Sequence, residues 1–592
     1  MKISIIGVLL CMICAVATAK RGARSRTPYV KLGHASWLKG KQTTFRGVKV
    51  NLFLGIPYAV PPIGSYRFEK PVKYPAWTGV RSATTMTPPC YQLRPGDSPV
   101  GDEDCLYLDI TVPKTVRKGR RFRRQKKPVI VYIHGGAYRY GAKTWFLGAP
   151  LAVAGDVIMV TLNYRVGPFG FLSEGPGTGN FGLWDQNLAL KWVKDNIAAL
   201  GGDPSSITIF GESAGAGSVS AHMLSEHSDG LFQRAIQMSG DLYTFWGWYL
   251  SDNQRDSIAA GVKLSVNCTD TSQSLYDCLR DLSAADVLTN DVILSNSLAL
   301  HPVPDNDFFP ANISEESYEL SKRFDLLTGF NGQEGLQFID SIFQKGGPLY
   351  TNGTPPELVT GIVFSACSTV NPQSVDTCLA FFNEQYGITT KSDDMDRAVA
   401  LSALYGDFAF VAPVERQLSH HSNNSRKSTY GYYFNQVFIE PENASRQNVP
   451  DWIRRSAGHY DAIPYVFGGH YISQEYDHIV NAYTGGRELT PDEQLNMELY
   501  NGTSENFQQL NDILMTAFTN FAKSGNPNSP VALPIPQWPE FDSTQSLLME
   551  FHGRLPNLTS VVTTPGKTRL NALQEVVMEA QKVQTLADSS SP

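Results

Sequence analysis

A serine flanked by glycines is the first candidate for chemistry in this chain. The pentapeptide Gly211-Glu212-Ser213-Ala214-Gly215 follows the apolar run Ile207-Thr208-Ile209-Phe210 and precedes small residues that are compatible with a helix. A sharp turn from strand to helix strains the backbone of its central residue and exposes the hydroxyl group. Glycines on either side leave room where strand and helix cross. Because the G-x-S-x-G pattern is common, Ser213 requires partner residues before it indicates a site.

The partners follow from the weakness of a serine hydroxyl as a nucleophile. It needs a histidine to take its proton, a carboxylate to orient that histidine, and N–H donors for the oxyanion formed on the substrate. The stretch His134-Gly135-Gly136-Ala137-Tyr138 directly follows a buried apolar run, and its glycines let backbone N–H groups face a substrate oxygen. We assign the oxyanion hole to Gly136, Ala137 and Ala214. The alternative is an ordinary glycine-rich turn.

The elements that must position these residues alternate along the chain. Residues 128–133 and 157–162 indicate buried parallel strands, 187–197 a helix, and 234–238 another strand. This order predicts an α/β protein with a mostly parallel central sheet and helices on both faces. Ligands of such sheets bind at the carboxyl ends of the strands, where Ser213 would lie.

Composition and charge exclude few functions. The chain has 592 residues, 42% hydrophobic and 18% charged, with a formal charge of −6. This globular composition gives no general signal for nucleic-acid or membrane binding. The stretch 114–127 is strongly basic and contains no acidic residue. We interpret it as a solvated surface loop, with a processing site or a polyanion contact as alternatives.

The N-terminus has the pattern of a signal peptide. Lys2 precedes the apolar residues 3–16, and Ala17-Thr18-Ala19 is a small-x-small cleavage site. A membrane anchor is the alternative, although the run is short for one. We expect cleavage after Ala19 and a secreted protein without a membrane anchor, since no later stretch of the sequence approaches the length of an apolar membrane span.

Cysteines and glycosylation signals fit an oxidising compartment. Cys11 and Cys14 leave with the signal peptide, and the other six fall into pairs that are close in sequence, which is typical of small disulfide loops; free buried thiols are the alternative. These six are Cys90, Cys105, Cys268, Cys278, Cys367 and Cys378. Sequons for N-glycosylation stand at Asn267, Asn312, Asn352, Asn423, Asn443, Asn501 and Asn557.

Longer motifs resemble the type-B carboxylesterase and cholinesterase family. They are Gly55 to Ala59, Glu103 to Leu108, His134 to Ala137, Asn163 to Arg165, Gly170 to Leu172, Gly179 to Gln186, Gly201 to Pro204, Phe210 to Gly215 and Thr519 to Ala522. The resemblance covers about Tyr29 to Phe551. It implies an α/β-hydrolase fold in which large insertions form a deep gorge leading to the serine.

The resemblance supports a simple division of the chain. We expect a signal peptide over residues 1–19, a short basic segment over 20–28, one carboxylesterase-type domain over 29–555, and a C-terminal tail over 556–592. Apolar residues between Leu570 and Val583 recur every three to four positions, which predicts an amphipathic helix. We expect this helix to pack on its own domain, with packing on a partner as the alternative.

The resemblance also identifies the acid and the base. The family's acid is a glutamate in a strand-end loop ending Glu-Gly, which matches Glu334 after the strand-like residues 324–330. The family's histidine lies four residues before a stretch that matches Ile463 to Gly468, which identifies His459. The family usually has glycine after this histidine, where this chain has Tyr460. Asp461 also sits one place earlier than the usual acidic residue. His420 and His421 sit in a polar sequence that we interpret as a glycosylatable loop.

The same resemblance bears on disulfides and substrate. The family pairs Cys90 with Cys105 and Cys268 with Cys278, which leaves Cys367 and Cys378 as a local pair. Cholinesterases bind choline on a tryptophan inside the first disulfide loop, but residues 91–104 contain none. Trp246 matches a tryptophan on the acyl side, and we assign Trp246 and Glu212 to the substrate pocket.

The resemblance therefore implies a serine carboxylesterase for small apolar esters. Ser213 would carry the acyl group, His459 would act as general base and acid, and Glu334 would orient His459. This chemistry needs no metal or cofactor, and we expect no nucleic-acid partner. One alternative is a catalytically silent adhesion protein similar to neuroligins, which usually lose triad members and carry a transmembrane anchor. The other is a secreted binding or storage protein with a vestigial site.

Overall fold

The structure, a computed structural model, describes most of the chain between residues 27 and 574. The described ranges are 27–33, 35–93, 98–114, 125–175, 177–242, 252–268, 270, 272–295, 300–308, 317–336, 353–370, 375–388, 393–423, 425–436, 457–484, 505–552 and 559–574. The predicted signal peptide, residues 115–124 of the basic stretch and Trp246 lie outside them, as do the sequons at Asn312, Asn352, Asn443, Asn501 and Asn557. Asn267 and Asn423 lie within them and are exposed.

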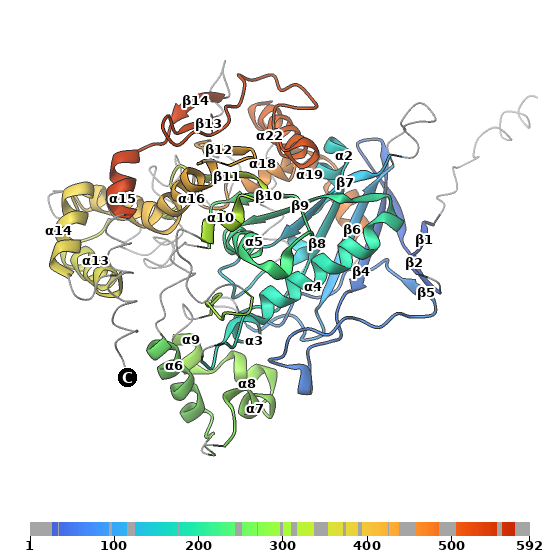
Figure 1. Cartoon of the computed structure of the whole chain (residues 1–592), viewed down its shortest axis with the longest axis horizontal. Coiled ribbons are helices and arrows are strands. Elements are labelled where there is room, and N and C mark those ends of the chain that lie inside the picture. The colour runs from blue at the N-terminus through green and yellow to red at the C-terminus, as the bar shows by residue number, and fades with distance from the viewer. Residues whose placement is uncertain are drawn as a thin grey trace, which may run out of the picture.

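An eleven-stranded sheet forms the centre of the protein (Figure 1), in the order β14-β13-β12-β11-β10-β9-β7-β8-β6-β4-β3. Neighbouring strands from β8 to β13 run parallel. The strands β3, β4, β6 and β14 add antiparallel pairs at the two ends. This arrangement confirms the predicted α/β class with a mostly parallel sheet.

The strands of this sheet are β3 (Lys41–Phe45), β4 (Val48–Pro57), β6 (Tyr107–Pro113), β7 (Lys127–Ile133), β8 (Ile158–Leu162), β9 (Gly202–Glu212), β10 (Arg234–Met238), β11 (Asp325–Asn331), β12 (Thr429–Phe434), β13 (Leu547–Phe551) and β14 (Thr559–Thr563). A separate small sheet joins β1 (Tyr29–Lys31), β2 (Ser36–Lys39) and β5 (Gly79–Ser82). The strands expected over 128–133, 157–162 and 234–238 correspond to β7, β8 and β10.

The helices described are α2 (Ala149–Gly155), α3 (Gly167–Phe171), α4 (Phe181–Asn196), α5 (Ala214–Leu224), α6 (Asp252–Ser265), α7 (Leu275–Arg280), α8 (Ala284–Leu288), α9 (Asp291–Ser295), α10 (Tyr318–Ser321), α13 (Pro356–Val370), α14 (Val375–Tyr386), α15 (Asp394–Gly406), α16 (Ala412–Ser422), α18 (Ile463–Val466), α19 (Gly469–Gln474), α20 (Tyr476–Thr484) and α22 (Glu505–Ser524). A π-helical turn, η9 (Asp407–Val411), joins α15 to α16.

The central strand β7 is apolar throughout because both faces of the sheet are covered. Val129, Val131 and Ile133 belong to the apolar core that includes side chains of α4 and α5. Ile130 and Tyr132 belong to the core on the opposite face, which includes side chains of α2 and α22. Figure 1 shows α4 and α5 in front of the sheet. When both faces of a parallel sheet are covered, the side chains on both faces of a strand must be apolar, as they are in β7.

Helix α4 begins earlier than the sequence predicts. Its first turns contain Asp185 and Gln186, which interrupt the apolar pattern, and the expected helix therefore started only at residue 187. Both side chains are buried, and their hydrogen-bond partners offset the cost of removing polar groups from water. Arg165 donates to the Asp185 carboxylate at 2.8 and 2.7 Å, and Gln186 lies 3.1 Å from His222 Nε2. Paired polar groups can thus extend a buried helix beyond its apolar stripe.

The interpretation of His420 and His421 as loop residues is wrong. Both lie on α16, and His421 is fully buried. Its Nδ1 lies 2.7 Å from Thr429 Oγ1 and its Nε2 lies 3.1 Å from the Phe324 carbonyl oxygen. Burial lowers the pKa of His421 to about 4. His421, near the end of α16, is therefore a buried residue that links the start of β12 to the residue before β11.

The continuous helical segment Asp394–Ser422 is more apolar than the sequence analysis recognised. By length and composition alone it qualifies as a membrane span, with a mean hydropathy of 1.3 in its most apolar window. However, 78% of that window is buried inside the protein. Core helices pass the same test, and this burial identifies Asp394–Ser422 as one of them.

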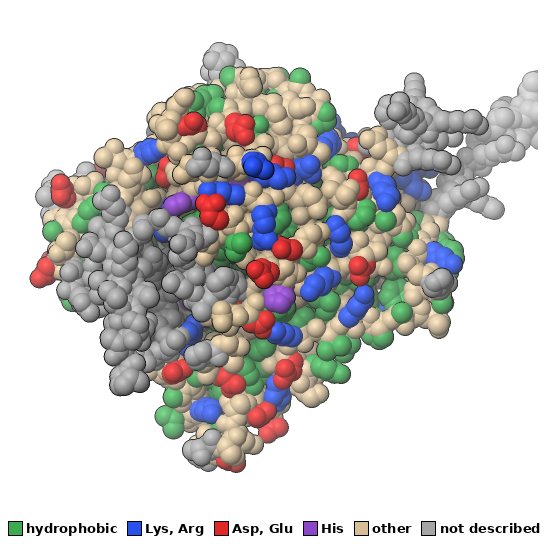
Figure 2. Space-filling view, in the orientation of Figure 1, with side chains coloured by type: hydrophobic (Ala, Val, Ile, Leu, Met, Phe, Trp, Pro, Cys, Tyr) green, Lys and Arg blue, Asp and Glu red, His purple; other side chains and the backbone are tan. Residues whose placement is uncertain are grey.

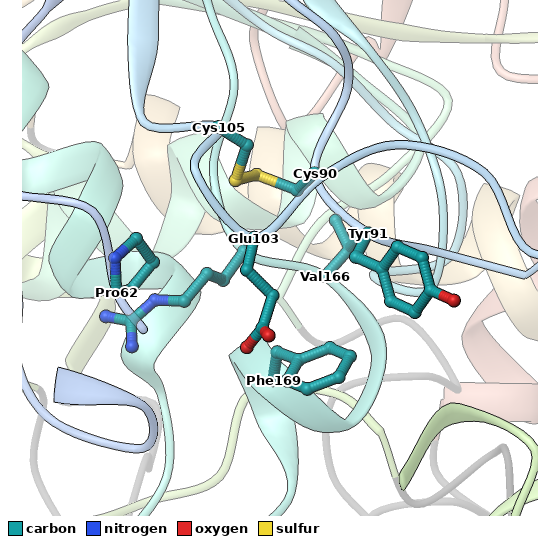
Figure 3. Close-up of a pocket in the computed structure, with 8 residues that line it drawn as sticks. Pro62, Cys90, Tyr91, Glu103, Cys105, Val166 and Phe169 are labelled. Atoms are coloured by element: carbon teal, nitrogen blue, oxygen red, sulfur yellow. A yellow bond between two sulfur atoms is a disulfide. The ribbon is translucent and has the colours of Figure 1, made fainter. Parts of the chain in front are cut away.

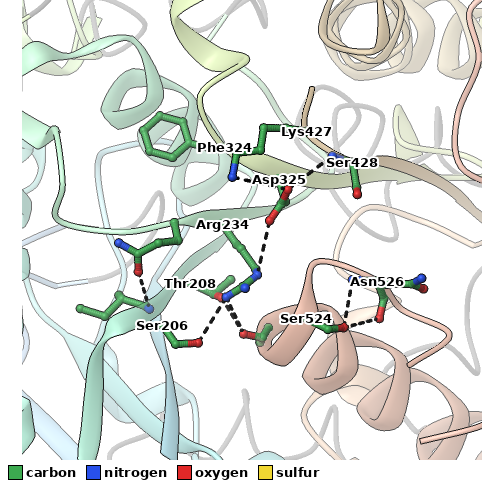
Figure 4. Close-up of polar contacts among 12 residues, drawn as sticks. Ser206, Thr208, Arg234, Phe324, Asp325, Lys427, Ser428, Ser524 and Asn526 are labelled. Atoms are coloured by element: carbon green, nitrogen blue, oxygen red, sulfur yellow. Dashed lines mark hydrogen bonds and ion pairs between the residues drawn. The ribbon is translucent and has the colours of Figure 1, made fainter. Parts of the chain in front are cut away.

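A polar network ties together the amino ends of the parallel strands, away from Ser213 (Figure 4). Arg234 begins β10 and donates to Ser206 Oγ at 3.3 Å and to the Ala522 carbonyl oxygen at 3.2 Å. Its Nε lies 3.5 Å from Asp325, which begins β11. Lys427 lies 3.9 Å from the same carboxylate. These contacts join β9, β10 and β11 to the end of α22.

The sheet continues beyond residue 555, where the sequence analysis places a tail. Strand β14 pairs with β13, and residues 567–574 are helical. Leu570 and Leu573 are fully buried in an apolar cluster that includes residues of α14, α15 and α16. The described part of the expected amphipathic helix therefore packs on the chain's own core.

The surface agrees with the modest net charge. On the face shown in Figure 2, basic and acidic side chains are interspersed rather than separated into regions of one sign. Ion pairs near the surface include Lys70–Asp307 and Arg323–Asp229.

Candidate active site

Ser213 lies in a strained turn between β9 and α5. Its backbone has φ 57° and ψ −124°, a region that residues with side chains rarely adopt. An added Cβ on Gly211 would lie 2.2 Å from the Gly215 carbonyl oxygen, and one on Gly215 would lie 2.2 Å from that of Ile133. Only glycine fits at either position. The Ser213 N–H donates to the Met238 carbonyl oxygen at 2.9 Å, which fastens the turn to β10.

Glu334 and His459 are brought together by a short backbone bridge. Gln333 pairs with Gly458 in parallel, and the Gln333 N–H donates to the Ala457 carbonyl oxygen at 2.8 Å. Glu334 follows Gln333 and His459 follows Gly458, so the bridge places these two residues side by side. His459 Nδ1 lies 2.6 Å from Glu334 Oε2, and both side chains are buried. Glu334 Oε1 accepts from the Asn331 N–H at 2.5 Å, which fixes the carboxylate at the end of β11.

The other ring nitrogen of His459 faces the residue before Ser213. His459 Nε2 lies 3.4 Å from Glu212 Oε1. Within the part of the chain that the structure describes, neither carboxyl oxygen of Glu212 has a hydrogen-bond partner. Burial, followed by repulsion from Glu334, raises the pKa of Glu212 well above its usual value. A protonated Glu212 avoids placing a second negative charge beside Glu334.

The loop after β7 packs against the turn at Ser213. Gly136, Ala137 and Tyr138 have consecutive positive φ values of 108°, 53° and 59°. An added Cβ on Gly135 would lie 3.1 Å from Ser213 Cβ. Among the described residues, the N–H groups of Gly136, Ala137 and Ala214 donate no hydrogen bond. These N–H groups therefore have no backbone or side-chain acceptor among the described residues, and their role as oxyanion donors stays a prediction.

Tyr460 stands where the family usually has glycine, and its backbone keeps a conformation that suits glycine. Its φ is 71°, the left-handed conformation that glycine adopts without strain. Its ring packs edge-on against the ring of His459, with centroids 4.7 Å apart. The loop thus has the backbone conformation expected for glycine while carrying an aromatic side chain.

Replacing Tyr460 should reverse the usual ranking of alanine and glycine. Y460G and Y460A both lose the ring, but only alanine retains the strain of a positive φ. We expect Y460G to be more stable than Y460A by about 1 kcal/mol in the free energy of unfolding, measured by denaturant titration. Equal stability, or a more stable Y460A, would show that the loop does not hold this conformation.

The residues that pack behind His459 belong to no motif recognised in the sequence. The Phe410 ring in η9 lies with its centroid 4.4 Å from that of His459. η9 begins at Asp407, whose Oδ2 accepts from Arg569 Nε at 2.8 Å and from the Tyr386 hydroxyl at 3.0 Å. Arg569 lies in the C-terminal helical residues 567–574. A π-helical turn inside a long helix is a common mark of a functional site, but no sequence pattern predicts it.

Another buried carboxyl group, that of Asp241, lies beside α5. Asp241 accepts hydrogen bonds from the Leu242 N–H at 2.6 Å and the Tyr318 hydroxyl at 3.2 Å. Ser220 of α5 also donates to it. Burial raises the pKa of Asp241 to about 6, against the opposing effects of these hydrogen bonds and of Arg416. The folded chain therefore holds this proton more tightly than the unfolded chain does.

The Asp241 carboxyl group should make stability depend on pH. Its contribution is fully present below pH 3.8 and is lost as the pH rises through about 6. Between pH 4 and pH 7, the free energy of unfolding of the wild type should fall relative to D241N by about 2 kcal/mol. Denaturant titrations at several pH values measure this difference. D203N is the control, because the pKa of Asp203 is lowered by Ser205 and its difference should have the opposite sign.

The remaining expectations can be located in the structure. The sulfur atoms of Cys90 and Cys105, of Cys268 and Cys278, and of Cys367 and Cys378 are bonded, which fits the pairs expected from the sequence. Glu212 lies at the site, as described above. Trp246 lies outside the described residues, so its place in a substrate pocket and the expected gorge stay predictions.

Comparison with known proteins shows the family to which the chain belongs. The model of the carboxylesterase family matches residues 27–564. Mouse neuroligin-3 is 34% identical over 533 residues, which cover 81% of this chain and 59% of neuroligin-3. Mouse neuroligin-2 is 33% identical over 526 residues. Rat bile salt-activated lipase is 33% identical over 545 residues, which cover 88% of this chain and 80% of the lipase.

The extent of these matches defines what is shared. The chain spans about three fifths of the length of the neuroligins that it matches. The family match covers nearly all of the described residues and carries the α/β-hydrolase fold, in agreement with the parallel sheet and the strained turn after β9. The chain belongs to the carboxylesterase family.

Proposed function

We propose that this chain is an extracellular serine carboxylesterase that hydrolyses small apolar carboxylic esters through an acyl group on Ser213. The buried pair of His459 and Glu334, 2.6 Å apart, is the main support, because it occurs at the same end of the sheet as the strained Ser213. A carboxylate that accepts from Nδ1 leaves Nε2 unprotonated and able to take a proton.

In the first step, Ser213 Oγ attacks the ester carbonyl carbon while His459 Nε2 takes the hydroxyl proton. The carbonyl oxygen becomes an oxyanion, which the N–H groups of Gly136, Ala137 and Ala214 stabilise. The C–O bond to the alcohol then breaks, and His459 gives its proton to the leaving alkoxide. Glu334 stays ionised and stabilises the imidazolium form of His459.

In the second step, water attacks the acyl carbon with His459 again as general base. A second oxyanion collapses, the bond to Ser213 Oγ breaks, and His459 returns the proton to the serine. The products are the carboxylic acid and a free Ser213. All proton transfers use residues of the site already described.

Substrate class rests on the sequence and on the relatives. Residues 91–104 contain no tryptophan that could bind a choline cation. One relative is named a lipase, which fits an apolar ester. The sequence pattern of a signal peptide, the disulfides and the exposed Asn267 and Asn423 fit an extracellular location.

The second candidate is a catalytically silent binding or adhesion protein. The identity of 33–34% with neuroligins favours it. The two candidates differ in what they require of the site. A protein without turnover does not require a buried His459–Glu334 pair beside a strained serine. In such a protein Ser213 would not be activated, and an organophosphate would not react with it.

Active-site labelling and turnover distinguish the two. The secreted chain is treated with a fluorophosphonate, digested and mapped by mass spectrometry, and assayed with nitrophenyl esters of increasing acyl length and with a choline ester. We expect the label on Ser213, turnover of the apolar esters, and little turnover of the choline ester. Absence of both labelling and turnover would refute the esterase and favour the binding protein.

A further inference from the structure

Gln92 connects the first disulfide loop to the loop that carries the proposed oxyanion hole. It lies two residues after Cys90 and is 1% exposed. Its backbone pairs with Val100 through two hydrogen bonds of 2.9 Å. The side-chain carboxamide reaches Gly141 in another loop. A buried carboxamide must satisfy its donors and its acceptor, so these bonds define its role.

A disulfide and an ion pair anchor the segment that carries Gln92. Figure 3 shows the Cys90–Cys105 disulfide beside a small pocket. Glu103, which lines this pocket, accepts two hydrogen bonds of 2.7 Å from Arg67. The disulfide and this two-point ion pair fix both ends of the segment. Gln92 therefore reaches Gly141 from an anchored segment.

The carboxamide of Gln92 makes a full set of hydrogen bonds. Oε1 accepts from the Gly141 N–H at 2.6 Å, and Nε2 donates to the Gly141 carbonyl oxygen at 3.0 Å. The other Nε2 hydrogen is directed to the Cys90 carbonyl oxygen at 2.8 Å. Since Nε2 faces two carbonyl oxygens, the orientation of the amide is determined. Gln92 thus holds both backbone groups of Gly141.

Gly141 in turn packs closely against the start of the loop. Its φ is 136°, and an added Cβ would lie 2.2 Å from His134 Nδ1 and 2.5 Å from the Gly135 carbonyl oxygen. Between these ends, the Gly136 carbonyl oxygen accepts from the N–H groups of Arg139 and Tyr140 at 3.0 and 3.1 Å. The positive φ values at Ala137 and Tyr138 store strain, which persists only when neighbouring groups hold the turn closed.

We propose that Gln92 is a positioning residue for the oxyanion hole. Through its two hydrogen bonds with Gly141, it keeps the loop in the turn that aims the N–H groups of Gly136 and Ala137 at the substrate oxygen. Gln92 acts through Gly141 and does not touch the substrate. The catalytic part of this proposal rests on the proposed esterase function.

Two substitutions at Gln92 separate positioning from general damage. Methionine has a similar length and makes no hydrogen bond to Gly141. Ionised glutamate places negative charge beside the Gly141 and Cys90 carbonyl oxygens, whereas protonated glutamate can donate to the Gly141 oxygen and accept from its N–H. Q92E therefore restores the pair with Gly141 only when it is protonated, and burial favours its protonated form.

The kinetic test uses a nitrophenyl ester, with kcat expressed per site titrated by an organophosphate. We expect Q92M to lower kcat about 10- to 100-fold, less than loss of a whole oxyanion donor, and to change KM by less than about twofold. Affinity for a trifluoromethyl ketone, which forms a tetrahedral oxyanion adduct, should fall by the same factor as kcat/KM. The ratio of kcat for Q92E to that of the wild type should rise as the pH falls from 8 to 5.5, while the ratio for Q92M stays constant.

The control is Q42M. Gln42 donates to Asn51 Oδ1 at 2.8 Å on the edge of the sheet, so this variant loses a glutamine hydrogen bond away from the loop and should behave as the wild type. An unchanged kcat per titrated site in Q92M would overturn the proposal. The proposal would also be overturned if the ratio of variant to wild-type kcat were the same for Q92E as for Q92M and did not change between pH 8 and 5.5.

Hydrogen exchange tests the tether without any substrate. Amide exchange in peptides covering residues 135–142 should be faster in Q92M than in the wild type and unchanged in Q42M. Unchanged exchange in Q92M would refute the tether itself. If exchange responds but the wild-type chain hydrolyses no ester, the tether stands, and both the proposed function and the catalytic role of Gln92 fail.

Discussion

Ser213→Ala should lower kcat for a nitrophenyl ester by about 10⁶-fold, the size of effect seen when a serine nucleophile is removed from a complete triad. The expected effect is large because alanine has no oxygen to form the acyl intermediate, and His459 then has no proton to take from a nucleophile. The oxyanion donors would still leave a residual rate about 10³-fold above that in water. The measurement is kcat of the purified secreted chain at saturating substrate.

Ser218→Ala provides the matched control for this experiment. Ser218 also lies on α5, where it accepts from Gln186 Nε2 at 3.1 Å. S218A therefore disturbs the same helix without removing the nucleophile, and its kcat should stay within a few fold of the wild type. If S213A retained a tenth or more of wild-type activity, Ser213 would not be the nucleophile.

Glu334→Gln should lower kcat by about 10⁴-fold with little change in KM. Glutamine has nearly the shape of glutamate, so packing at the end of β11 is kept. However, it can present an N–H group to His459 Nδ1, which then accepts, and the proton moves to Nε2, where it blocks general-base catalysis. The 2.6 Å distance between His459 Nδ1 and Glu334 Oε2 makes this tautomer change unavoidable when the amide points inward.

The control for Glu334 is Glu550→Gln. Glu550 lies on β13 and accepts from Asn435 Nδ2 at 3.1 Å and from Ser560 Oγ at 2.7 Å. E550Q loses a hydrogen-bonded carboxylate in the same sheet, away from His459, and should leave kcat nearly unchanged. A loss of less than tenfold in E334Q would mean that Glu334 does not orient His459 in the reaction.

Local sequence was sufficient to predict the sheet and the turn at Ser213. Strands such as β7 and β10 are short apolar runs with clear boundaries, and the glycines at 211 and 215 have one steric explanation. The start of α4 was missed because a pattern of apolar residues does not show that Asp185 has a partner in Arg165. His421 was misread for the same reason, since its partners lie on other strands.

The long-range parts of the site depended on the family resemblance. Nothing in the spacing of Glu334 and His459 predicts that a single backbone bridge at Gln333 and Gly458 brings them together. The motif after His459 identified it, but could not show that Tyr460 adopts a positive φ. Gln92 was not recognised, because a glutamine near a cysteine has no distinctive pattern and its function depends on a partner in another loop.

The contact between Arg569 and Asp407 has a consequence for the order in which the protein forms. A chain is made from its N-terminus, and domains fold as their segments become available. Ser213, Glu334 and His459 all leave the ribosome before β13, β14 and Arg569. The turn η9, which supports the ring of His459 through Phe410, gains its link to Arg569 only when the last described residues arrive. A nascent chain that already contains every reacting group is therefore still incomplete behind its histidine, and full support of that ring comes only near the end of synthesis.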